Sequence, residues 1–329
     1  MKTLRLLSLL LVVPALLFVA GCDEKSTEPT PPINEAEVLA AYLESSGDYL
    51  NTSNPAIVAA SDVRTTQLST PTAQYLIDIR SSTDYTNGHI QGAVNVTTAN
   101  LLTHVKGINA ASYTRVVVVC YTGQTAGFGT AALRLMGYSN AYSLKWGMCS
   151  WDSSFAQNRW LSNMQNTRAA QLVTTATAKN AAGSLPTLST GKTTGAEILE
   201  ARVNALLTEG FTPATVSNTT LFSNLTGYYI VNYWPATEYA AGHVPGAVQY
   251  TPKADLKLST NLKTLPASTP VVVYCYTGQT SASVAFILRT LGYDAKSLLY
   301  GANAMFFDTM PGTKFGASQI MGYPFVTGS

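Results

Sequence analysis

The chain has 329 residues, enough for about two ordinary domains, and a formal net charge of +2. Two basic residues, Lys2 and Arg5, lie in a segment that we expect to be removed, which leaves 308 residues (329 − 21) and a net charge of 0 (2 − 2). This balance argues against a nucleic-acid-binding protein, which needs an excess of Lys and Arg to displace counterions from phosphate. Hydrophobic residues make up 46% of the chain, so a buried core is expected, and four cysteines are too few for a disulfide scaffold.

The first residues have the composition of an export signal. Residues 1–5 are basic, and residues 6–20 form an apolar run that is shorter than the roughly 20 residues of a spanning helix. The run ends in VAGC at Cys22, which resembles the lipobox of bacterial lipoproteins. In that family the cysteine is acylated and becomes the first mature residue. The alternative is an ordinary signal peptide followed by a chance cysteine.

We therefore expect a signal peptide over residues 1–21 and a tether over residues 22–34. The tether is polar and rich in Pro, and it should be extended because it has no apolar face to bury. Lipid on the cysteine, such as palmitate, would hold the protein in a bacterial cell envelope, facing the periplasm and without spanning the membrane. Asp23 resembles an inner-membrane retention signal of enteric bacteria, but the choice between inner and outer membrane stays open.

The strongest pattern in the sequence is an internal repeat. GHIQGAV at residues 88–94 returns as GHVPGAV at residues 242–248, an offset of 154 (242 − 88). VVVCYTGQT at residues 117–125 returns as VVYCYTGQT at residues 272–280, an offset of 155 (272 − 117). The chain is therefore predicted to contain two copies of one unit.

The two copies set the expected domain boundaries. Repeat 1 is residues 35–165, and repeat 2 is residues 193–329, which includes the closing sequence GYPF at residues 322–325. Residues 166–192 have no clear period and are rich in Ala, Thr, Asn and Ser, so they form the expected linker.

Each repeat alternates predicted helices and strands. Apolar residues at helical spacing predict a helix near the start of each repeat, over residues 38–43 and 198–207. Short β-branched runs are typical of strands that are buried on both faces of a parallel sheet. The expected strands are 75–79, 116–119, 228–231 and 271–274, and the helices expected after them are 126–136 and 281–291. The pattern predicts an α/β fold in which each repeat has a central parallel sheet flanked by helices.

A cysteine stands at the carboxyl end of a buried strand in each repeat, where open α/β sheets place their active sites. Cys120 and Cys275 are both followed by YTGQT, whose glycine permits a tight turn that aims backbone N–H groups at the loop centre. These N–H groups and the partial positive charge of the next helix are expected to lower the pKa of each thiol, which suits a nucleophile. The alternative is an inert buried cysteine in each repeat.

These motifs resemble those of the rhodanese family. In repeat 1 the resemblance rests on Asp78 and Arg80, on the GHIxGA segment and on the loop of residues 120–125; in repeat 2 it rests on GHVxGA and the loop of residues 275–280. It implies two rhodanese-like domains with sulfurtransferase chemistry. A loop thiolate attacks a sulfane sulfur, as in thiosulfate, and sulfite departs. The loop N–H groups then hold the cysteine persulfide until a thiol or cyanide accepts the sulfur.

The resemblance assigns roles to the residues of both repeats. Cys120 and Cys275 are the expected nucleophiles. The residues expected to bind the donor and the persulfide are Tyr121, Thr122, Gly123, Gln124, Thr125, Tyr276, Thr277, Gly278, Gln279 and Thr280. The residues expected to brace the framework are Asp78, Arg80, His89 and His243. The alternative for the two histidines is a role as bases beside the cysteines. No cofactor is implied, and three histidines give little support to a metal site.

The sequence departs from the family pattern in two ways. Repeat 2 has Asn232 and Trp234 where repeat 1 has the Asp–Arg pair. Neither loop contains the Lys or Arg that thiosulfate-specific relatives often carry to hold the dianion, so the donor stays open. Related phosphatases use a loop that is one residue longer and ends in Arg, whereas these loops end in Thr125 and Thr280, which disfavours a phosphatase.

Cys149 has no counterpart in repeat 2, where Asn303 takes its place. In this fold its segment runs near the mouth of the active site. It is expected either to form a disulfide with Cys120 or resolve a persulfide there, or to be a free, packed thiol. Tyr121 and Tyr276 either form an aromatic wall of the pocket or pack against a neighbouring loop.

Two functions are compatible with the sequence. The first is an exported, lipid-anchored sulfurtransferase that moves sulfane sulfur, or chemically similar selenium, through a cysteine persulfide. The second is a non-catalytic module, which would act as a sulfur or chalcogen carrier, a redox sensor or a docking lipoprotein. The expected partners are a small sulfur-containing donor, a thiol acceptor and a membrane bound through lipid, with no nucleic acid.

Overall fold

The structure is a computed structural model, and it describes residues 33–328. The expected signal peptide, Cys22 and most of the tether lie outside the described residues. Between residues 33 and 328, no helix is both long enough and apolar enough to cross a membrane.

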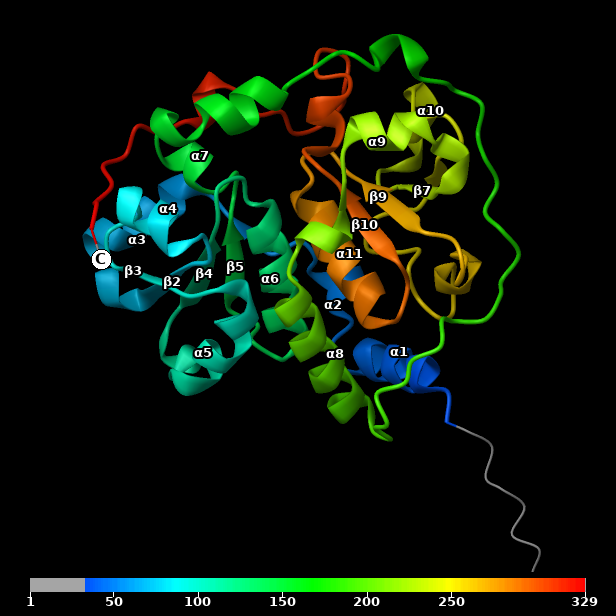
Figure 1. Ribbon diagram of the computed structural model, residues 1–329, viewed down its shortest axis with the longest axis horizontal. Coiled ribbons are helices and arrows are strands. Elements are labelled where there is room, and N and C mark those ends of the chain that lie inside the picture. The colour runs from blue at the N-terminus through cyan, green and yellow to red at the C-terminus, as the bar shows by residue number, and fades with distance from the viewer. Residues whose placement is uncertain (1–32, 329) are drawn as a thin grey trace, which may run out of the picture. The chain divides into compact units, whose positions relative to one another are not determined.

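Each repeat is built on a five-stranded parallel sheet covered by helices (Figure 1). The strand order is β1-β5-β4-β2-β3 in repeat 1 and β6-β10-β9-β7-β8 in repeat 2, so the two sheets have the same topology. The strands of repeat 1 are β1 (Ile57–Val58), β2 (Gln74–Asp78), β3 (Ala93–Asn95), β4 (Arg115–Val119) and β5 (Ala141–Leu144). Those of repeat 2 are β6 (Thr215–Val216), β7 (Tyr229–Asn232), β8 (Val248–Gln249), β9 (Val271–Tyr274) and β10 (Ala295–Leu298). The predicted α/β class is therefore confirmed.

The helices follow the same internal symmetry. Those of repeat 1 are α1 (Glu35–Ser45), α2 (Tyr49–Thr52), α3 (Ala60–Ser69), α4 (Ser82–Asn87), α5 (Leu101–Gly107), α6 (Gln124–Leu135) and α7 (Met148–Trp151). Those of repeat 2 are α8 (Gly195–Glu209), α9 (Asn218–Ser223), α10 (Ala236–Ala241) and α11 (Gln279–Thr290). The first helix of each repeat begins with a side-chain cap, because Asn34 accepts from the N–H of Glu37 and Thr194 accepts from that of Glu197.

The helices that follow the cysteines begin two residues earlier than the sequence predicts. The expected starts are residues 126 and 281, whereas α6 begins at Gln124 and α11 at Gln279. The reason is the preceding glycine, since Gly123 has φ 82° and Gly278 has φ 79°. This left-handed conformation suits glycine and turns the chain into the helix within one residue.

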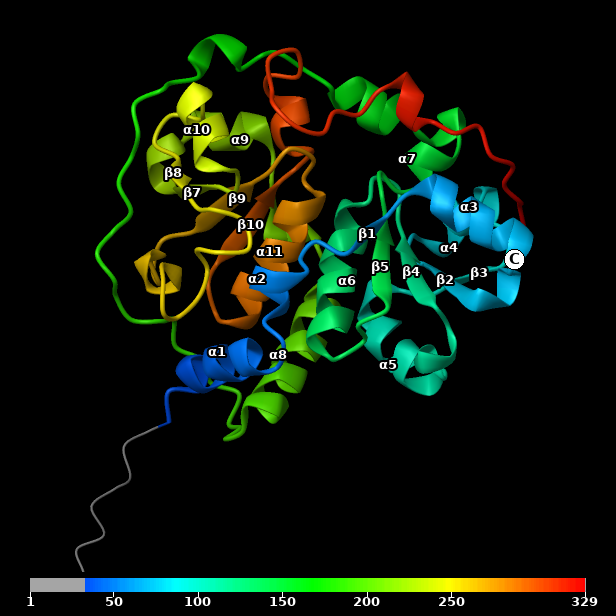
Figure 2. The same ribbon diagram turned by 180° about the vertical axis from the view of Figure 1, so that it is seen from behind.

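The helices α6 and α11 pack against each other between the two sheets (Figures 1 and 2). The rings of Phe128 and Phe286 meet edge to face with their centroids 4.7 Å apart, and Phe211 lies 5.3 Å from Phe128. Buried residues of both repeats belong to this one cluster. The two repeats therefore share a hydrophobic core.

The N-terminal helix of each repeat packs on the other repeat. Helix α1 contacts α8, and Glu37 forms an ion pair with Lys263 at 2.9 Å. Beyond α1, the Nδ2 atom of Asn51 donates to the carbonyl of Leu256 at 3.0 Å. Helix α8 in turn reaches repeat 1, where its Glu200 forms an ion pair with Lys106 on α5.

The linker after repeat 1 and the C-terminal segment of repeat 2 each pair with the histidine turn of a repeat that does not precede them directly in the chain: the linker with repeat 2 and the C-terminal segment with repeat 1. The linker pairs Val173 with His243 of repeat 2 as a short antiparallel bridge, and the C-terminal segment pairs Val326 with His89 of repeat 1 in the same way. The closing sequence GYPF at residues 322–325, which the sequence places with repeat 2, therefore packs on repeat 1. Figure 2 shows the C-terminus beside α3. A one-dimensional repeat pattern carries no information on which copy a terminal segment covers.

The shared core predicts how a substitution at its centre acts. Phe128→Ala removes a fully buried ring that contacts both repeats, so it should lower the free energy of unfolding of the whole chain by about 3–5 kcal/mol. Urea unfolding should remain a single transition. Leu68→Ala is the control, because that side chain is 69% exposed and should change the stability by less than about 0.5 kcal/mol. Two separate transitions in Phe128→Ala would contradict a shared core.

Candidate active site in the two cysteine loops

Cys120 directly follows β4, and its sulfur lies at the centre of the loop. The backbone N–H groups of Gly123 and Ala126 both donate to Sγ at 3.2 Å. These donors come from the turn and from the first residues of α6. The loop therefore forms the cradle of N–H groups that the sequence predicts.

Cys275 lies in the same position after β9. Its Sγ accepts N–H groups from Gly278 at 3.2 Å and from Ser281 at 3.3 Å. Ser281 stands where repeat 1 has Ala126, and its hydroxyl adds a contact to Sγ at 3.5 Å. The hydroxyl of Thr277 also lies 4.0 Å from this sulfur, so the second cradle has side-chain hydroxyl groups in addition to its backbone N–H groups.

Both sulfurs are buried, and burial changes the expected acidity of Cys120. The two cysteines are 4% and 2% exposed. Burial raises the pKa of Cys120, while N–H groups from Ala126, Thr122 and Gly123 lower it by less than burial raises it. The predicted lowering of the pKa of Cys120 is therefore wrong, because the loss of hydration destabilises the thiolate more than the N–H groups stabilise it.

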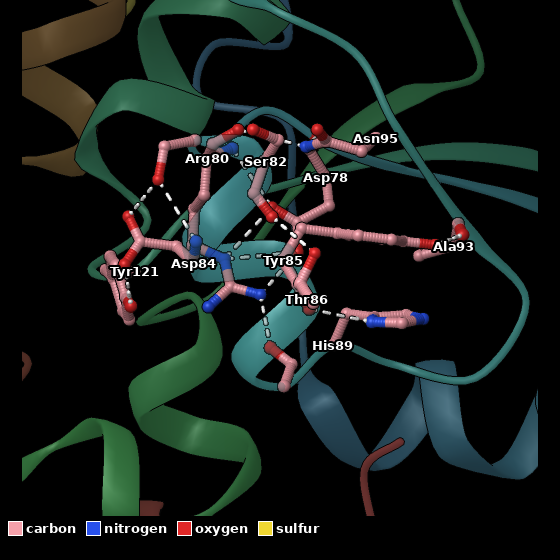
Figure 3. Close-up of polar contacts among 12 residues, drawn as sticks. Asp78, Arg80, Ser82, Asp84, Tyr85, Thr86, His89, Ala93, Asn95 and Tyr121 are labelled. Atoms are coloured by element: carbon pink, nitrogen blue, oxygen red, sulfur yellow. Dashed lines mark hydrogen bonds and ion pairs between the residues drawn. The ribbon is translucent and has the colours of Figure 1, made fainter. Parts of the chain in front are cut away.

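Tyr121 is held at the edge of the first loop. Its hydroxyl donates to Oδ1 of Asp84 on α4 at 2.6 Å (Figure 3). The guanidinium groups of Arg80 and Arg159 lie 4.7 Å and 3.4 Å from its ring centroid. Burial and the adjacent Asp84 raise the pKa of Tyr121. Neither arginine belongs to the loop, so positive charge reaches its edge from neighbouring segments.

Asp78 and Arg80 form a buried ion pair beside this tyrosine (Figure 3). Nη2 of Arg80 lies 2.6 Å from Oδ2 of Asp78 and also donates to the carbonyl of Gly88 at 2.6 Å. The pair ties the end of β2 to the turn that follows α4. These contacts suit the expected framework role, which stays a prediction.

Repeat 2 replaces the ion pair with uncharged groups. Nδ2 of Asn232 donates to the hydroxyl of Tyr274 at 2.6 Å. The indole of Trp234 stacks on Tyr276 with ring centroids 5.2 Å apart and an angle of 14° between planes. Trp234 therefore covers the loop tyrosine as Arg80 does in repeat 1, and the second loop keeps its packing without a buried charge.

The two histidines brace turns. Each ring stacks on a tyrosine four residues earlier with centroids 3.6 Å apart, His89 on Tyr85 and His243 on Tyr239. Each Nδ1 contacts the carbonyl of the same tyrosine, at 2.9 Å and 2.7 Å respectively. Nε2 of His243 also contacts the carbonyl of Thr175 in the linker at 3.1 Å. These contacts favour the framework role over the role of a base.

Cys149 is a free, fully buried thiol. Its Sγ donates to the carbonyl of Phe155 at 3.1 Å, and burial raises its pKa to about 12. Such a thiol is a weak nucleophile at neutral pH. Of the two alternatives, the structure has the packed thiol, and the contact that involves the loop is its backbone N–H, which donates to the carbonyl of Tyr121 at 3.0 Å.

An aromatic cluster that the sequence analysis missed lies beside the first loop. The indole N–H of Trp160 donates to the carbonyl of Thr122 at 3.1 Å. The Trp160 ring contacts Trp146 of its own repeat and both Tyr300 and Phe315 of repeat 2. Two pairs of its members are separated by the same offsets as the repeated motifs: Trp146 and Tyr300 by 154 residues (300 − 146), and Trp160 and Phe315 by 155 (315 − 160). This shared aromatic spacing was the available signal.

The remaining loop residues divide by environment. Thr125 and Thr280 lie half-buried in the first turns of α6 and α11. Oγ1 of Thr277 accepts from the N–H of Gln279 at 3.2 Å and lies 4.0 Å from Sγ of Cys275. The side chains of Gln124 and Gln279 are buried and contact the opposite repeat. No group of three potential metal ligands among His, Cys, Asp and Glu occurs within residues 33–328.

The pKa of Cys149 predicts a pH-dependent contribution to stability. The unfolded thiol loses its proton near pH 9, whereas the folded thiol keeps it to about pH 12, so this contribution falls as pH rises from 9 to 12. Between pH 8 and pH 10, wild type should lose about 1.4 kcal/mol more unfolding free energy than Cys149→Ala. Urea unfolding of both proteins under reducing conditions measures this difference. An equal loss in both would show that Cys149 is not protonated and buried as described.

Comparison with protein families matches the rhodanese-like domain at residues 62–154 and 224–305, together slightly more than half of the chain. The thiosulfate sulfurtransferase GlpE of Shewanella oneidensis is 35% identical over 82 residues, which cover 25% of this chain and 78% of that protein. The adenylyltransferase and sulfurtransferase uba4 of Ogataea parapolymorpha is 27% identical over 92 residues, which are 28% of this chain and 23% of that much longer protein.

Solved structures of similar proteins include a thiosulfate sulfurtransferase from Pseudomonas aeruginosa, with 19% identity, a TM-score of 0.30, and coverage of 86% of this chain and 49% of that one. A rhodanese-related protein from Thermoplasma volcanium has 17% identity, a TM-score of 0.26, and coverage of 31% of this chain and 92% of that one. One family match falls in each repeat, and each match contains one of the cysteine loops. The chain therefore belongs to the rhodanese-like domain family, with one copy of the domain in each repeat.

Proposed function

We propose that the protein is a sulfurtransferase that moves sulfane sulfur through a persulfide on Cys120 and on Cys275. The observation that carries this proposal is the position of each sulfur, which accepts two backbone N–H groups at 3.2–3.3 Å. A cradle of this kind stabilises a negative sulfur without a nearby charged side chain. Membership of the rhodanese-like domain family adds support.

The chemistry needs a thiolate and a donor with a sulfur-bonded leaving group. The cysteine thiolate attacks the outer sulfur of thiosulfate, a new S–S bond forms, and the S–S bond of the donor breaks to release sulfite. The persulfide keeps the negative charge on its outer sulfur, where the loop N–H groups can hold it. An acceptor thiolate or cyanide then attacks that outer sulfur and restores the cysteine thiolate.

The donor is proposed as a small sulfane-sulfur compound, with thiosulfate the first to test. Several similar proteins are named thiosulfate sulfurtransferases. The loops contain no Lys or Arg, but Arg80 and Arg159 flank Tyr121 at the edge of the first loop. A surface hollow lined by Tyr121, Phe155 and Arg159 lies at this edge, so an anion can be attracted there before it reaches the sulfur. Selenium, with similar chemistry, belongs to the same proposal.

The burial of both sulfurs favours a second candidate function. Cys120 and Cys275 are only 4% and 2% exposed, so neither sulfur is accessible to a donor in this conformation. Burial also raises the pKa of Cys120, which disfavours the thiolate that the transfer needs. A non-catalytic rhodanese-like module would keep this closed loop. It would act as a sulfur or chalcogen carrier, as a redox sensor or in docking to a partner.

One experiment separates the two functions. The purified protein is incubated with thiosulfate and then with cyanide, while thiocyanate and intact mass are measured. A sulfurtransferase gains about 32 Da, one sulfur atom, for each cysteine that forms a persulfide, and it returns this sulfur as thiocyanate when cyanide is added. Cys120→Ser and Cys275→Ser should each remove their share of both signals, whereas Cys149→Ser, the matched control, should keep both. Absence of adduct and thiocyanate with every sulfane-sulfur donor would contradict catalysis and favour the non-catalytic module.

We also propose that the protein is anchored in a bacterial cell envelope by lipid on Cys22, facing the periplasm. The support is the lipobox-like VAGC sequence and the polar tether after it. Cys22→Ala should move the protein from the membrane to the soluble fraction of lysed cells, and incorporation of labelled palmitate should be lost. Unchanged labelling in this variant would contradict the anchor.

A further inference from the structure

The glutamine of each cysteine loop reaches into the opposite repeat. Oε1 of Gln279 accepts the backbone N–H of Trp146 at 2.9 Å. Its Nε2 donates to the carbonyls of Gly123 and Leu144, both at 3.3 Å. Every side-chain hydrogen bond that the structure gives Gln279 within residues 33–328 therefore ends in repeat 1, although the residue belongs to the loop of Cys275.

Gln124 makes the reciprocal contact. Its Oε1 accepts the backbone N–H of Tyr300 at 2.8 Å, and Tyr300 is the repeat-2 counterpart of Trp146. Its Nε2 donates within its own loop to Oγ1 of Thr122 at 3.2 Å. The two glutamines are 2% and 1% exposed, so water does not replace these bonds.

Each glutamine accepts from a residue whose backbone is strained. Trp146 has φ 63° and Tyr300 has φ 60°, which is the left-handed region that bulky side chains avoid. A buried N–H at such a residue is costly when it has no acceptor. The opposite glutamine supplies that acceptor and so helps to hold the strained turn.

Each strained turn also donates a hydrogen bond to the neighbouring cysteine loop. Two residues after Trp146, the N–H of Met148 donates to the carbonyl of Cys120 at 2.8 Å. In repeat 2 the N–H of Ala302 donates to the carbonyl of Cys275 at 3.0 Å. A chain of contacts thus leads from the glutamine of one repeat to the backbone of the nucleophile in the other.

The loop glycines leave room for these glutamines. A Cβ atom on Gly123 would lie 2.3 Å from Nε2 of Gln279, and one on Gly278 would lie 2.3 Å from Oε1 of Gln124. The space that each glycine leaves beside its loop is therefore filled by the glutamine of the other repeat. We call these four residues the glycine–glutamine clamp, because Gln279 packs against Gly123 and Gln124 packs against Gly278.

We propose that Gln279 is a positioning residue for Cys120, and that Gln124 is a positioning residue for Cys275. This inference rests on the proposed function, because it assigns the part that each repeat plays in the site of the other. Each repeat supplies the N–H groups around its own cysteine, while the acceptor for the turn behind that loop comes from the other repeat. The competing interpretation is that each glutamine only starts its own helix and shapes its own loop.

The two interpretations predict opposite patterns of thiol reactivity. Gln279→Met keeps the length of the side chain and removes its hydrogen bonds. This variant loses all three side-chain hydrogen bonds of Gln279, including the acceptor for the N–H of Trp146. Cys120 should therefore react with iodoacetamide at least about tenfold faster at pH 8, because loss of even one buried hydrogen bond corresponds to a change of about that size in how often its loop opens. Cys275, in the same loop as the substitution, should change by less than about twofold. Mass spectrometry of the cysteine-containing peptides measures both rates in the full chain.

Two further variants complete the test. Gln124→Met should increase the rate at Cys275 more than the rate at Cys120. Gln74→Met is the matched control, because Gln74 is a buried glutamine whose Nε2 donates at 2.9 Å to Val63 within repeat 1. It should leave both rates unchanged.

The outcomes decide between the interpretations. A larger change at Cys275 than at Cys120 in Gln279→Met, or equal changes at both, would overturn the crossed assignment. Unchanged rates at both would also overturn it. If Gln279→Met lowers the melting temperature more than Gln74→Met does, the rates in Gln124→Met are compared in its place. Alkylation needs no sulfur donor, so it tests the positioning roles separately from the proposed sulfur transfer. If Gln279→Met changes the rate at Cys120 more than at Cys275 but the protein forms no persulfide, the positioning roles stand and the proposed sulfur transfer is wrong.

Discussion

A buried backbone N–H needs an acceptor, and in this protein the acceptor for the turn behind each cysteine loop comes from the other repeat. Trp146 and Tyr300 are held in the left-handed conformation by Gln279 and Gln124. These bonds exist only because α6 and α11 pack side by side and bring the two loops together. The geometry of each candidate site therefore depends on contact between the repeats as much as on its own loop.

Other segments of the chain also connect the two repeats. Helix α1 packs on repeat 2, and helix α8 contacts repeat 1. The linker pairs with the histidine turn of repeat 2, and the C-terminal segment of repeat 2 pairs with the histidine turn of repeat 1. Repeat 2 has meanwhile exchanged the buried Asp78–Arg80 pair for Asn232 and the stacked Trp234. Loop geometry survives this change because an aromatic plane covers Tyr276 as the guanidinium covers Tyr121, without the cost of a buried ion pair.

The local structure around the cysteines could be predicted from the sequence, because β-branched runs, a loop glycine and a following helix act over a few residues. The four strands whose bounds were predicted, β2, β4, β7 and β9, each lie within one residue of the expected position. Helix α6 instead begins at Gln124, because a left-handed glycine turns the chain into the helix earlier than the apolar pattern indicates. The acidity of Cys120 could not be predicted, since it depends on how much water the folded chain excludes. The crossed glutamines could not be predicted either, because the internal repeat does not reveal which copy faces which.

Hydrogen exchange at the amides of Trp146 and Tyr300 in the full chain tests the central claim most directly. If each amide is held by the glutamine of the other repeat inside a shared core, both should exchange with the same free energy and the same urea dependence as the amides of β4 and β9. Exchange of these two amides through a local opening that does not respond to urea, while β4 and β9 stay protected, would contradict the account.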